Sequence, residues 1–241
     1  MKTATLLLSL LALGVPPAGV ASAQQPQTQT WNPAITPAPR NDWIDRHNGF
    51  VARARDGGVD LLFVGDSITD AWRNRGKSVW TERYEPLRAA NFGIGGDRTE
   101  HVLWRLQNGE LDGINPKVTV LMIGTNNTHR DSATQIVEGV TTIVKEIRQR
   151  TPNTKILLLA IFPRAEKADH PLRQKINEIN PQIAKLDDGK HIFFLDINDK
   201  FLQPDGVVPA SIMPDFLHPN EEGYRIWGDA MADKLAELLK S

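Results

Sequence analysis

The chain has 241 residues, of which 40% are hydrophobic and 24% are charged, and this size and composition suffice for one large globular domain. Its formal net charge of −1 excludes the strongly basic surface that nucleic-acid binding needs, so we expect no nucleic-acid partner. The sequence contains no cysteine, which excludes disulfides, thiolate nucleophiles and cysteine-ligated zinc.

The N-terminal residues 1–23 have the features of a secretory signal peptide. Lys2 gives a positively charged start, an apolar run follows, and the small residues 21–23 are typical of a cleavage site. The run is short for a membrane span, so we expect export to the periplasm or out of the cell, without stable membrane insertion after cleavage. The alternative is an uncleaved anchor helix. Residues 24–40 are rich in Gln, Pro and Thr and predict a flexible leader, followed by one folded domain over residues 41–241.

From residue 41 onward, helical patterns alternate with uniformly apolar segments. In chain order we expect a helix at 41–58, strands at 59–64 and 89–94, a helix at 98–109, a strand at 117–124, a helix at 132–150, a strand at 155–162, a helix at 171–189, a strand at 191–197 and a helix at 221–239. Pro181 should kink or divide the helix that contains it. The alternation predicts an α/β fold with a five-stranded parallel sheet covered on both faces.

Polar turns follow three of the predicted strands. Ser67 follows the first strand, residues 95–97 (Gly-Gly-Asp) follow the second, and residues 125–127 (Thr-Asn-Asn) follow the third. In a parallel sheet of this kind, ligands bind beyond the carboxyl ends of the strands. We therefore expect the three turns to meet at one edge of the sheet and to form the functional site there.

Ser67 has two interpretations. Its hydroxyl could cap a helix that starts near Ile68, which is a common role for a serine after a strand. A catalytic serine needs in addition a base, an orienting carboxylate and hydrogen-bond donors for an oxyanion. Asp215 and His218, three residues apart just before the last helix, can supply the carboxylate and the base. The segment lacks the second glycine of the G-x-S-x-G elbow, which argues against an α/β-hydrolase.

Other polar residues near these turns have structural roles as their first interpretation. Asp66 is expected to brace its turn through backbone hydrogen bonds. The start of the helix after the second strand should be capped by polar residues that also make surface contacts, namely Asp97, Arg98 and His101. His129 and Arg164 are candidates for the rim of the site, which the sequence leaves open.

Four sequence blocks together resemble the SGNH (GDSL-type) hydrolases. They are GDSIT around Ser67, NFGIGGDRTEHVLWRL at residues 91–106, IGTNN at residues 123–127 and DFLHPNEEGY at residues 215–224. With PLRQK at residues 171–175, they are most similar to the catalytic-subunit branch of the platelet-activating-factor acetylhydrolases Ib. The resemblance extends over residues 59–239 and implies a flavodoxin-like three-layer α/β/α sandwich.

The resemblance also implies roles for individual residues. It assigns the nucleophile to Ser67, the base to His218 and the orienting acid to Asp215. The implied oxyanion donors are the backbone N–H groups of Ser67 and Gly96 and the side-chain amide of Asn126. No metal and no cofactor are implied.

Two positions depart from the family pattern. Ile68 replaces the leucine of the name-giving motif at a position that tolerates other apolar side chains. Asn127 replaces an aspartate that many members carry, but the acetylhydrolase branch also has asparagine there. Neither departure predicts a loss of function.

The resemblance implies a serine esterase that works through an acyl-enzyme, and its ester has to be inferred. With the predicted export, the leading interpretation is hydrolysis of short-chain acetyl esters of carbohydrate. The alternatives are a lipid-ester hydrolase (a lysophospholipase or a platelet-activating-factor-type acetylhydrolase), an O-acyltransferase, and an inactive module that binds glycans through exposed aromatic residues such as Trp72 and Trp80. The oligomeric state is not predicted.

Overall fold

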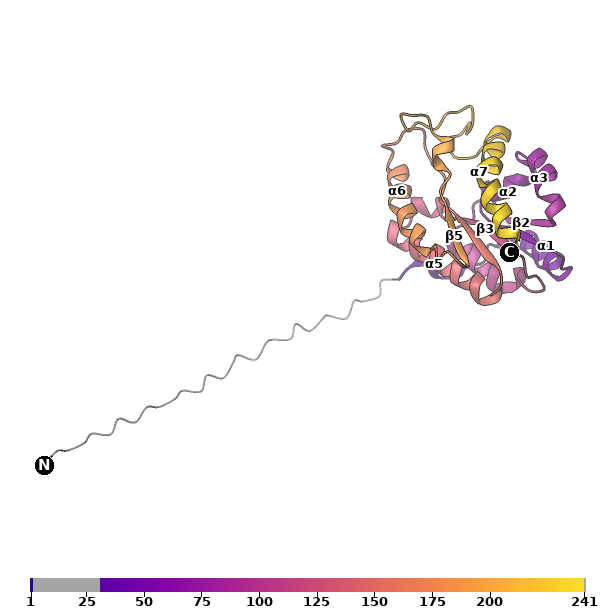
Figure 1. Ribbon diagram of the computed structural model, residues 1–241, viewed down its shortest axis with the longest axis horizontal. Coiled ribbons are helices and arrows are strands. Elements are labelled where there is room, and N and C mark those ends of the chain that lie inside the picture. Colours follow the sequence, from indigo (N-terminus) through magenta and orange to yellow (C-terminus); the bar gives the residue numbers. More distant parts are fainter. Residues whose placement is uncertain (2–30, 241) are drawn as a thin grey trace. The chain divides into compact units, whose positions relative to one another are not determined.

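The computed structural model describes Met1 and residues 31–240 (Figure 1). The predicted signal peptide, apart from Met1, and the first part of the predicted leader lie outside the described residues. Residues 32–240 belong to the compact unit Asn32–Ser241. None of the helices in the described residues has the length and apolar character that crossing a membrane requires.

The centre of this unit is a sheet of five parallel strands, β1 Leu61–Gly65, β2 Ala89–Gly93, β3 Val118–Met122, β4 Lys155–Leu159 and β5 Ile192–Leu195. Their spatial order is β2-β1-β3-β4-β5, the flavodoxin-like order. Gly65 of β1 lies opposite Gly93 of β2 and Met122 of β3, so these three strands end level with one another. The predicted five-stranded parallel sheet is confirmed.

Helices cover both faces of the sheet, which confirms the three-layer α/β/α sandwich (Figure 1). One face packs against α1 Ile44–Arg55, α4 Thr99–Arg105, α5 Ala133–Arg150 and α6 Pro171–Ile183. The other face packs against α2 Ser67–Asp70, α3 Lys77–Arg83 and α7 Glu221–Lys240. Successive side chains of a strand alternate between the faces, so burial on both sides requires the uniformly apolar strands that the sequence contains.

The helices differ from the predicted ones in two places. The four-residue helix α2 was expected only in the interpretation of Ser67 as a cap, and the seven-residue helix α3 was not predicted, because segments of this length show no clear helical period. The predicted break at Pro181 falls just after it: α6 ends at Ile183 and continues as a 3-10 turn over Ala184–Leu186.

Residues 32–40 pack against the domain, although the sequence predicted a flexible leader there. The Asn32 amide donates a hydrogen bond to the Glu138 carboxylate on α5 at 2.6 Å. Ala34 is fully buried, and its carbonyl accepts a hydrogen bond from the Thr99 hydroxyl at 2.8 Å. These long-range contacts, which the local composition does not indicate, place the start of the compact unit at Asn32 and not at residue 41.

The aromatic residues that follow β1 form an internal cluster. Trp72 is fully buried, and its ring centroid lies 4.6 Å from that of Tyr224 and 4.8 Å from that of Trp227, both on α7. Trp80 is partly buried, with its ring centroid 5.1 Å from that of Phe63 on β1. The expectation that Trp72 and Trp80 form an exposed platform for glycans is therefore wrong, because both rings pack against the sheet and its covering helices.

Candidate active site

Ser67 opens α2 directly after the end of β1. Asp66 is the N-cap of this helix, because its Oδ1 accepts a hydrogen bond from the Ile68 N–H at 3.0 Å. The bracing role expected for Asp66 is confirmed, and the interpretation of Ser67 as the cap is wrong. A Cβ at Gly65 would overlap the Thr69 side chain, so only glycine lets the strand end this close to α2.

Asp215 and His218 lie in a tight loop before α7. The Oδ1 atom of Asp215 accepts hydrogen bonds from the backbone N–H of Leu217 at 3.2 Å and of His218 at 2.7 Å. Phe216 has a φ of +56°, which is rare for a bulky residue, and its carbonyl accepts a hydrogen bond from the Ala165 N–H at 2.9 Å. The loop therefore holds one strained residue in order to wrap its backbone around the Asp215 carboxylate.

The two segments bring three side chains into a chain of hydrogen bonds. Ser67 Oγ lies 2.9 Å from His218 Nε2, and Asp215 Oδ2 lies 2.7 Å from His218 Nδ1. The carboxylate favours a proton on Nδ1, which leaves Nε2 as the acceptor for the Ser67 hydroxyl. Partial burial raises the pKa of Asp215, but hydrogen bonds from the His218 backbone and ring outweigh this effect and hold the pKa below its usual value. Asp215 is therefore ionised at neutral pH.

The turns after β2 and β3 lie next to this chain. A Cβ at Gly95 would be 3.9 Å from the Ser67 Cβ, and Gly96 has a φ of +79°, a conformation that glycine adopts readily. The Asn126 amide donates a hydrogen bond to the Asp97 carbonyl at 2.8 Å, which joins the two turns. Within the described residues, neither the Ser67 N–H nor the Gly96 N–H has an acceptor, so both are available to a ligand.

A buried network of charged side chains lies behind the turn after β2. Asp97 is 1% exposed and accepts a hydrogen bond from Arg105 Nε, on α4, at 2.8 Å. Arg105 also forms an ion pair with Glu110, whose other oxygen lies 3.0 Å from His47 Nδ1 on α1. Because paired charges of this kind fix geometry strongly, the turn is attached to α1 and α4 by ion pairs as well as by apolar packing.

Asn127 and His101 have structural roles. Asn127 is fully buried, its Oδ1 accepts a hydrogen bond from the Thr99 N–H at 3.0 Å, and its amide donates to Asp131 at 2.7 Å. His101 Nδ1 accepts a hydrogen bond from the Arg98 N–H at 3.0 Å, and burial lowers the pKa of this imidazole to about 4. His101 is thus a neutral cap of α4, as expected, and Asn127 connects the turn after β3 to the same helix.

Arg164 lies half-buried beside the turn after β3. Its Nη1 donates a hydrogen bond to the Thr125 carbonyl at 2.9 Å. Burial lowers the pKa of Arg164, while the negative charges of Asp66 and Asp215 act in the opposite direction, so this arginine interacts with both sides of the site. His129 is exposed, and partial burial followed by the positive charge of Arg164 lowers its pKa. Arg164 therefore lies at the rim that the sequence left open, and a place of His129 there stays a prediction.

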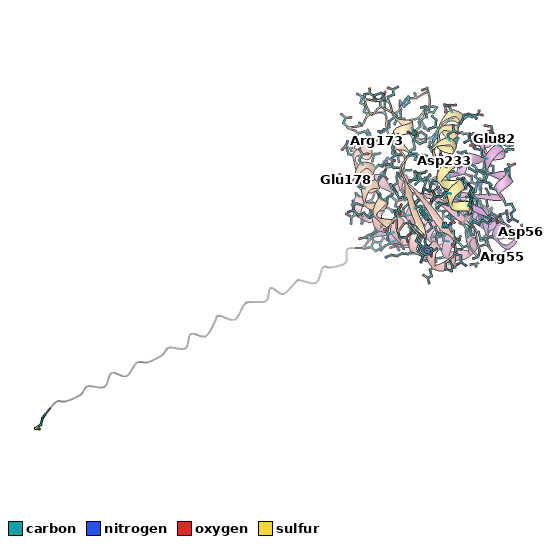
Figure 2. The ribbon with its side chains drawn as sticks, viewed as in Figure 1. Arg55, Asp56, Glu82, Arg173, Glu178 and Asp233 are labelled. Atoms are coloured by element: carbon teal, nitrogen blue, oxygen red, sulfur yellow. The ribbon has the colours of Figure 1, made fainter. Side chains whose placement is uncertain are left out.

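Arg173 lies at the start of α6 (Figure 2). Its guanidinium donates hydrogen bonds to the carbonyl groups of Arg164 at 2.9 Å, of Gly206 at 3.2 Å and of Ala165. It is 3% exposed, and no carboxylate in the described part of the chain pairs with it. Because the Ala165 N–H donates to the Phe216 carbonyl, Arg173 supports the His218 loop through one intervening residue.

Three arginines that support the site were missed by the sequence reasoning. Arg105 and Arg173 lie on the apolar faces of α4 and α6, and a charged residue inside an apolar helical pattern is the signal that could have found them. Arg40 lies in the predicted leader, and no local pattern marks it. In the described residues, no three His, Asp or Glu side chains gather in a way that could hold a metal ion.

Known sequences match the part of the chain that contains the site. Residues 63–226 match the GDSL-like lipase/acylhydrolase family. The chain is 43% identical over 217 residues to platelet-activating factor acetylhydrolase IB subunit alpha2 of Homo sapiens, with 87% of this chain and 93% of the relative covered. It is 38% identical over 215 residues to subunit alpha1 of Homo sapiens, with 86% and 91% covered.

Solved structures share the fold. A GDSL-like lipase from Bacteroides thetaiotaomicron gives a TM-score of 0.65 at 17% identity over 81% of this chain and 96% of that one. A catalytic mutant of an acetylxylan esterase from Geobacillus stearothermophilus gives 0.59 at 21% identity over 76% and 94%. At these identities the likeness concerns the fold alone, whereas the sequence matches establish the family. The chain thus belongs to the GDSL-like lipase/acylhydrolase (SGNH) family and is a carboxylic ester hydrolase.

Proposed function

We propose that the protein hydrolyses acetyl and other short-chain esters, with Ser67 as nucleophile, His218 as base and Asp215 as orienting acid. The observation that carries this proposal is the chain of hydrogen bonds from Ser67 Oγ through the imidazole to the carboxylate, with distances of 2.9 and 2.7 Å. The proposed oxyanion donors are the N–H groups of Ser67 and Gly96 and the Asn126 amide, which lie in the three turns at the strand ends.

The proposed reaction has two steps. Ser67 Oγ attacks the ester carbonyl carbon while its proton passes to His218 Nε2, and the negative charge that develops on the carbonyl oxygen is stabilised by the three donors. The bond to the alcohol then breaks, the alcohol takes the proton from His218, and the acyl group stays on Ser67. Water attacks this acyl-enzyme with His218 as base again, which releases the carboxylic acid and restores the serine hydroxyl.

The acetyl group is supported by the names of two different relatives. The human proteins that are 43% and 38% identical are named platelet-activating factor acetylhydrolases, and one structural neighbour is named an acetylxylan esterase. The lipid and the polysaccharide in these names have little in common on the alcohol side. What the two names share is the acetyl ester, and we propose the same acyl group for this chain.

A groove beside the proposed acid, lined mainly by polar residues, supports carbohydrate as the alcohol. It is lined by Asn74, Arg75, Pro214, Asp215, Asn220 and Glu221. Side chains with many hydrogen-bonding groups suit an alcohol rich in hydroxyl groups better than they suit an alkyl chain. We therefore propose acetylated carbohydrate as the substrate.

A lipid ester is the second candidate, because the relatives at 43% identity are named for platelet-activating factor. The carbohydrate and lipid candidates are distinguished by comparing kcat/KM on acetylated xylan, O-acetyl sialic acid, an acetyl glycerophospholipid and p-nitrophenyl esters of increasing length. Carbohydrate acetates should be the better substrates by at least about tenfold. A higher kcat/KM on the phospholipid would assign the lipid ester instead.

The role of Ser67 is tested by labelling with a fluorophosphonate, which reacts with activated serines. Peptide mapping should find the label on Ser67 and no label on a Ser67→Ala variant. An unlabelled wild-type protein would favour the inactive binding module. An O-acyltransferase would also be labelled, but it would transfer acetyl to an added sugar in preference to water, which product analysis with and without the sugar detects.

Export of the protein is a further proposal, supported by the charged start, the apolar run and the small residues 21–23. Expression with the native N-terminus followed by fractionation should recover a protein that begins near Gln24 from the periplasm or the medium. Recovery of the full-length chain in the cytosol would contradict export, and recovery of it in the membrane would favour the uncleaved anchor.

A further inference from the structure

Arg40 reaches the turn after β2 from the segment that precedes α1. Its Nη1 donates a hydrogen bond to the Gly95 carbonyl at 2.6 Å and lies 3.3 Å from Asp97 Oδ1. Its Nη2 forms an ion pair with Asp42 at 2.7 Å. The Arg40 side chain is 21% exposed and that of Asp97 is 1% exposed, so the contact is largely screened from water. A residue from outside the predicted domain thus holds a backbone group of the active site.

The Gly95 carbonyl and the Gly96 N–H belong to the same peptide group. In a trans peptide these two bonds lie in one plane and point in opposite directions. A donor that fixes the direction of the carbonyl therefore also fixes the direction of the N–H. Arg40 occupies the carbonyl side of this peptide, and the N–H on the other side has no acceptor in the described residues.

The charge on Arg40 acts on the same peptide group. A hydrogen bond from a cation draws electron density toward the carbonyl oxygen, and this polarisation makes the N–H a better donor. Gly96 is also the residue that lets Arg40 approach, since a Cβ at Gly96 would be 3.1 Å from Arg40 Nη1. The arginine and the glycine therefore fit each other, independently of the φ of +79° at Gly96.

We propose that Arg40 is a positioning residue that aims the Gly96 N–H at the oxyanion by holding the other end of its peptide group. It is also connected to a second donor, because Asp97, which it approaches, accepts the Asn126 amide through its carbonyl. This inference rests on the proposed oxyanion role of Gly96 and Asn126. It makes the segment before α1 part of the catalytic apparatus, although Arg40 forms no hydrogen bond with Ser67.

The test is the kinetics of Arg40→Ala and Arg40→Lys with p-nitrophenyl acetate. Arg40→Ala should lower kcat about 10- to 100-fold with KM nearly unchanged, which is less than the loss for removing a donor because the N–H is displaced and not deleted. Low, non-denaturing concentrations of guanidinium should restore part of the lost kcat. The kcat of Arg40→Lys should lie between those of wild type and Arg40→Ala, since one ammonium group cannot hold the Gly95 carbonyl, Asp97 and Asp42 together.

Arg46→Ala is the matched control. Arg46 lies on the helix α1 that follows, pairs with Asp70 at 2.8 Å and stacks over Trp43, but it has no hydrogen bond or ion pair with residues 95–97. Its kcat should stay within about twofold of the wild-type value. An Arg40→Ala variant that resembles Arg46→Ala overturns the proposal. A loss of kcat that guanidinium does not restore assigns Arg40 a structural role only, which overturns it as well.

Asn126→Ala, measured in parallel, separates failure of this inference from failure of the proposed function. A large loss of kcat in Asn126→Ala with full activity in Arg40→Ala contradicts only the role of Arg40. Full activity in Asn126→Ala contradicts the oxyanion site on which the role of Arg40 depends.

Discussion

The two halves of the active site are anchored in different ways. The donor half consists of the turns after β1, β2 and β3, and its polar anchors are buried: Asp66 and Asn127 are 0% exposed and Asp97 is 1% exposed. The base half is a loop before α7, in which the side chains of Asp215 and His218 are 50% and 24% exposed. Substitutions in the donor half should therefore affect stability as well as rate, whereas substitutions of the exposed groups in the base half should affect mainly the rate.

The carboxyl groups of the two halves also differ in burial, and their pKa values shift in opposite directions. Burial raises the pKa of Asp66 to about 7, and its Oδ2 has no hydrogen-bond partner among the described residues. Partial burial raises the pKa of Asp215, but the hydrogen bonds from His218 together outweigh this effect and hold the pKa below its usual value. Burial thus disfavours the charge on the acid beside the nucleophile, whereas hydrogen bonds stabilise the charge on the acid beside the base.

Both halves nevertheless depend on an arginine from elsewhere in the chain. Arg40 holds the Gly95 carbonyl in the donor half, and Arg173 holds three carbonyl groups next to the His218 loop. Carbonyl oxygens are good acceptors for a guanidinium, which offers five donors in a fixed geometry. In each half, a side chain outside the reacting set therefore sets the path of an irregular backbone segment.

The largest expected effect in the base half comes from His218→Ala. Without the imidazole, no group takes the Ser67 proton, so kcat/KM on p-nitrophenyl acetate should fall about 10⁴- to 10⁶-fold. Because the side chain is partly exposed, Tm should stay within about 2 °C of the wild-type value. The control is His191→Ala, at a partly exposed site just before β5, which should keep full activity. A loss below about tenfold in His218→Ala would break the assignment of the base.

Two neighbouring asparagines sharpen the comparison within the donor half. Asn126→Ala removes one proposed oxyanion donor and should lower kcat about 10²- to 10³-fold while the protein stays folded. Asn127→Ala removes a fully buried side chain that binds the Thr99 N–H and Asp131, and it should lower the free energy of unfolding by about 2–4 kcal/mol. Kinetics and denaturant unfolding of both variants test this. If the effects of the two substitutions were exchanged, the assignment of roles in this turn would be wrong.

Arg173→Gln tests the one buried side chain on which we expect the otherwise exposed base half to depend. Loss of the three carbonyl contacts should lower kcat about tenfold and lower Tm by several degrees, because the Ala165–Phe216 connection loses its support. Gln174→Ala, at the neighbouring exposed position of α6, serves as control and should change neither quantity. Unchanged kcat in Arg173→Gln would show that local hydrogen bonds alone hold the loop.

Asp66→Asn should have the smallest effect on rate and a pH-dependent effect on stability. Between about pH 4 and pH 7 the folded state keeps the Asp66 proton that the unfolded chain has released, so the free energy of unfolding falls as the pH rises through this window. Asparagine keeps the cap acceptor without the charge. Relative to wild type, the variant should therefore gain stability with rising pH, by up to about 4 kcal/mol above pH 7.

Urea unfolding of both proteins from pH 4.5 to pH 8.5 measures this difference. Asp215→Asn, compared with wild type down to about pH 2, should show the opposite trend, because the stability from a lowered pKa is fully present above about pH 4 and is lost below it. A stability difference between Asp66→Asn and wild type that does not change with pH would mean that Asp66 is ionised throughout the range.

The sheet and the position of the site followed from simple features of the sequence. Strands buried on both faces must be apolar throughout, and parallel strands place the turns that follow them at one edge. From these two features alone, Ser67, Gly96 and Asn126 are predicted to lie near one another. The separation of three residues between Asp215 and His218 likewise allowed one loop to hold both, as the structure has them.

The remaining features depend on contacts between distant parts of the chain. Trp72 looked available for ligands because its burial is decided by Tyr224 and Trp227 at the other end of the sequence. Arg40 lies in a segment whose composition is that of a linker, and its partner Gly95 is far along the chain. Periodicity and motifs report local structure and strand order, but they do not report which long side chain reaches which turn.

The central claim is that Ser67, the imidazole–carboxylate pair and three hydrogen-bond donors act on the same carbonyl group. The most direct measurement is a crystal structure of the protein after reaction with a fluorophosphonate, whose phosphoryl oxygen takes the place of the oxyanion. We expect phosphorus bonded to Ser67 Oγ and its oxygen about 2.7–3.1 Å from the Ser67 N–H, the Gly96 N–H and the Asn126 amide. An adduct on another residue, or a phosphoryl oxygen directed away from these three groups, would contradict the account.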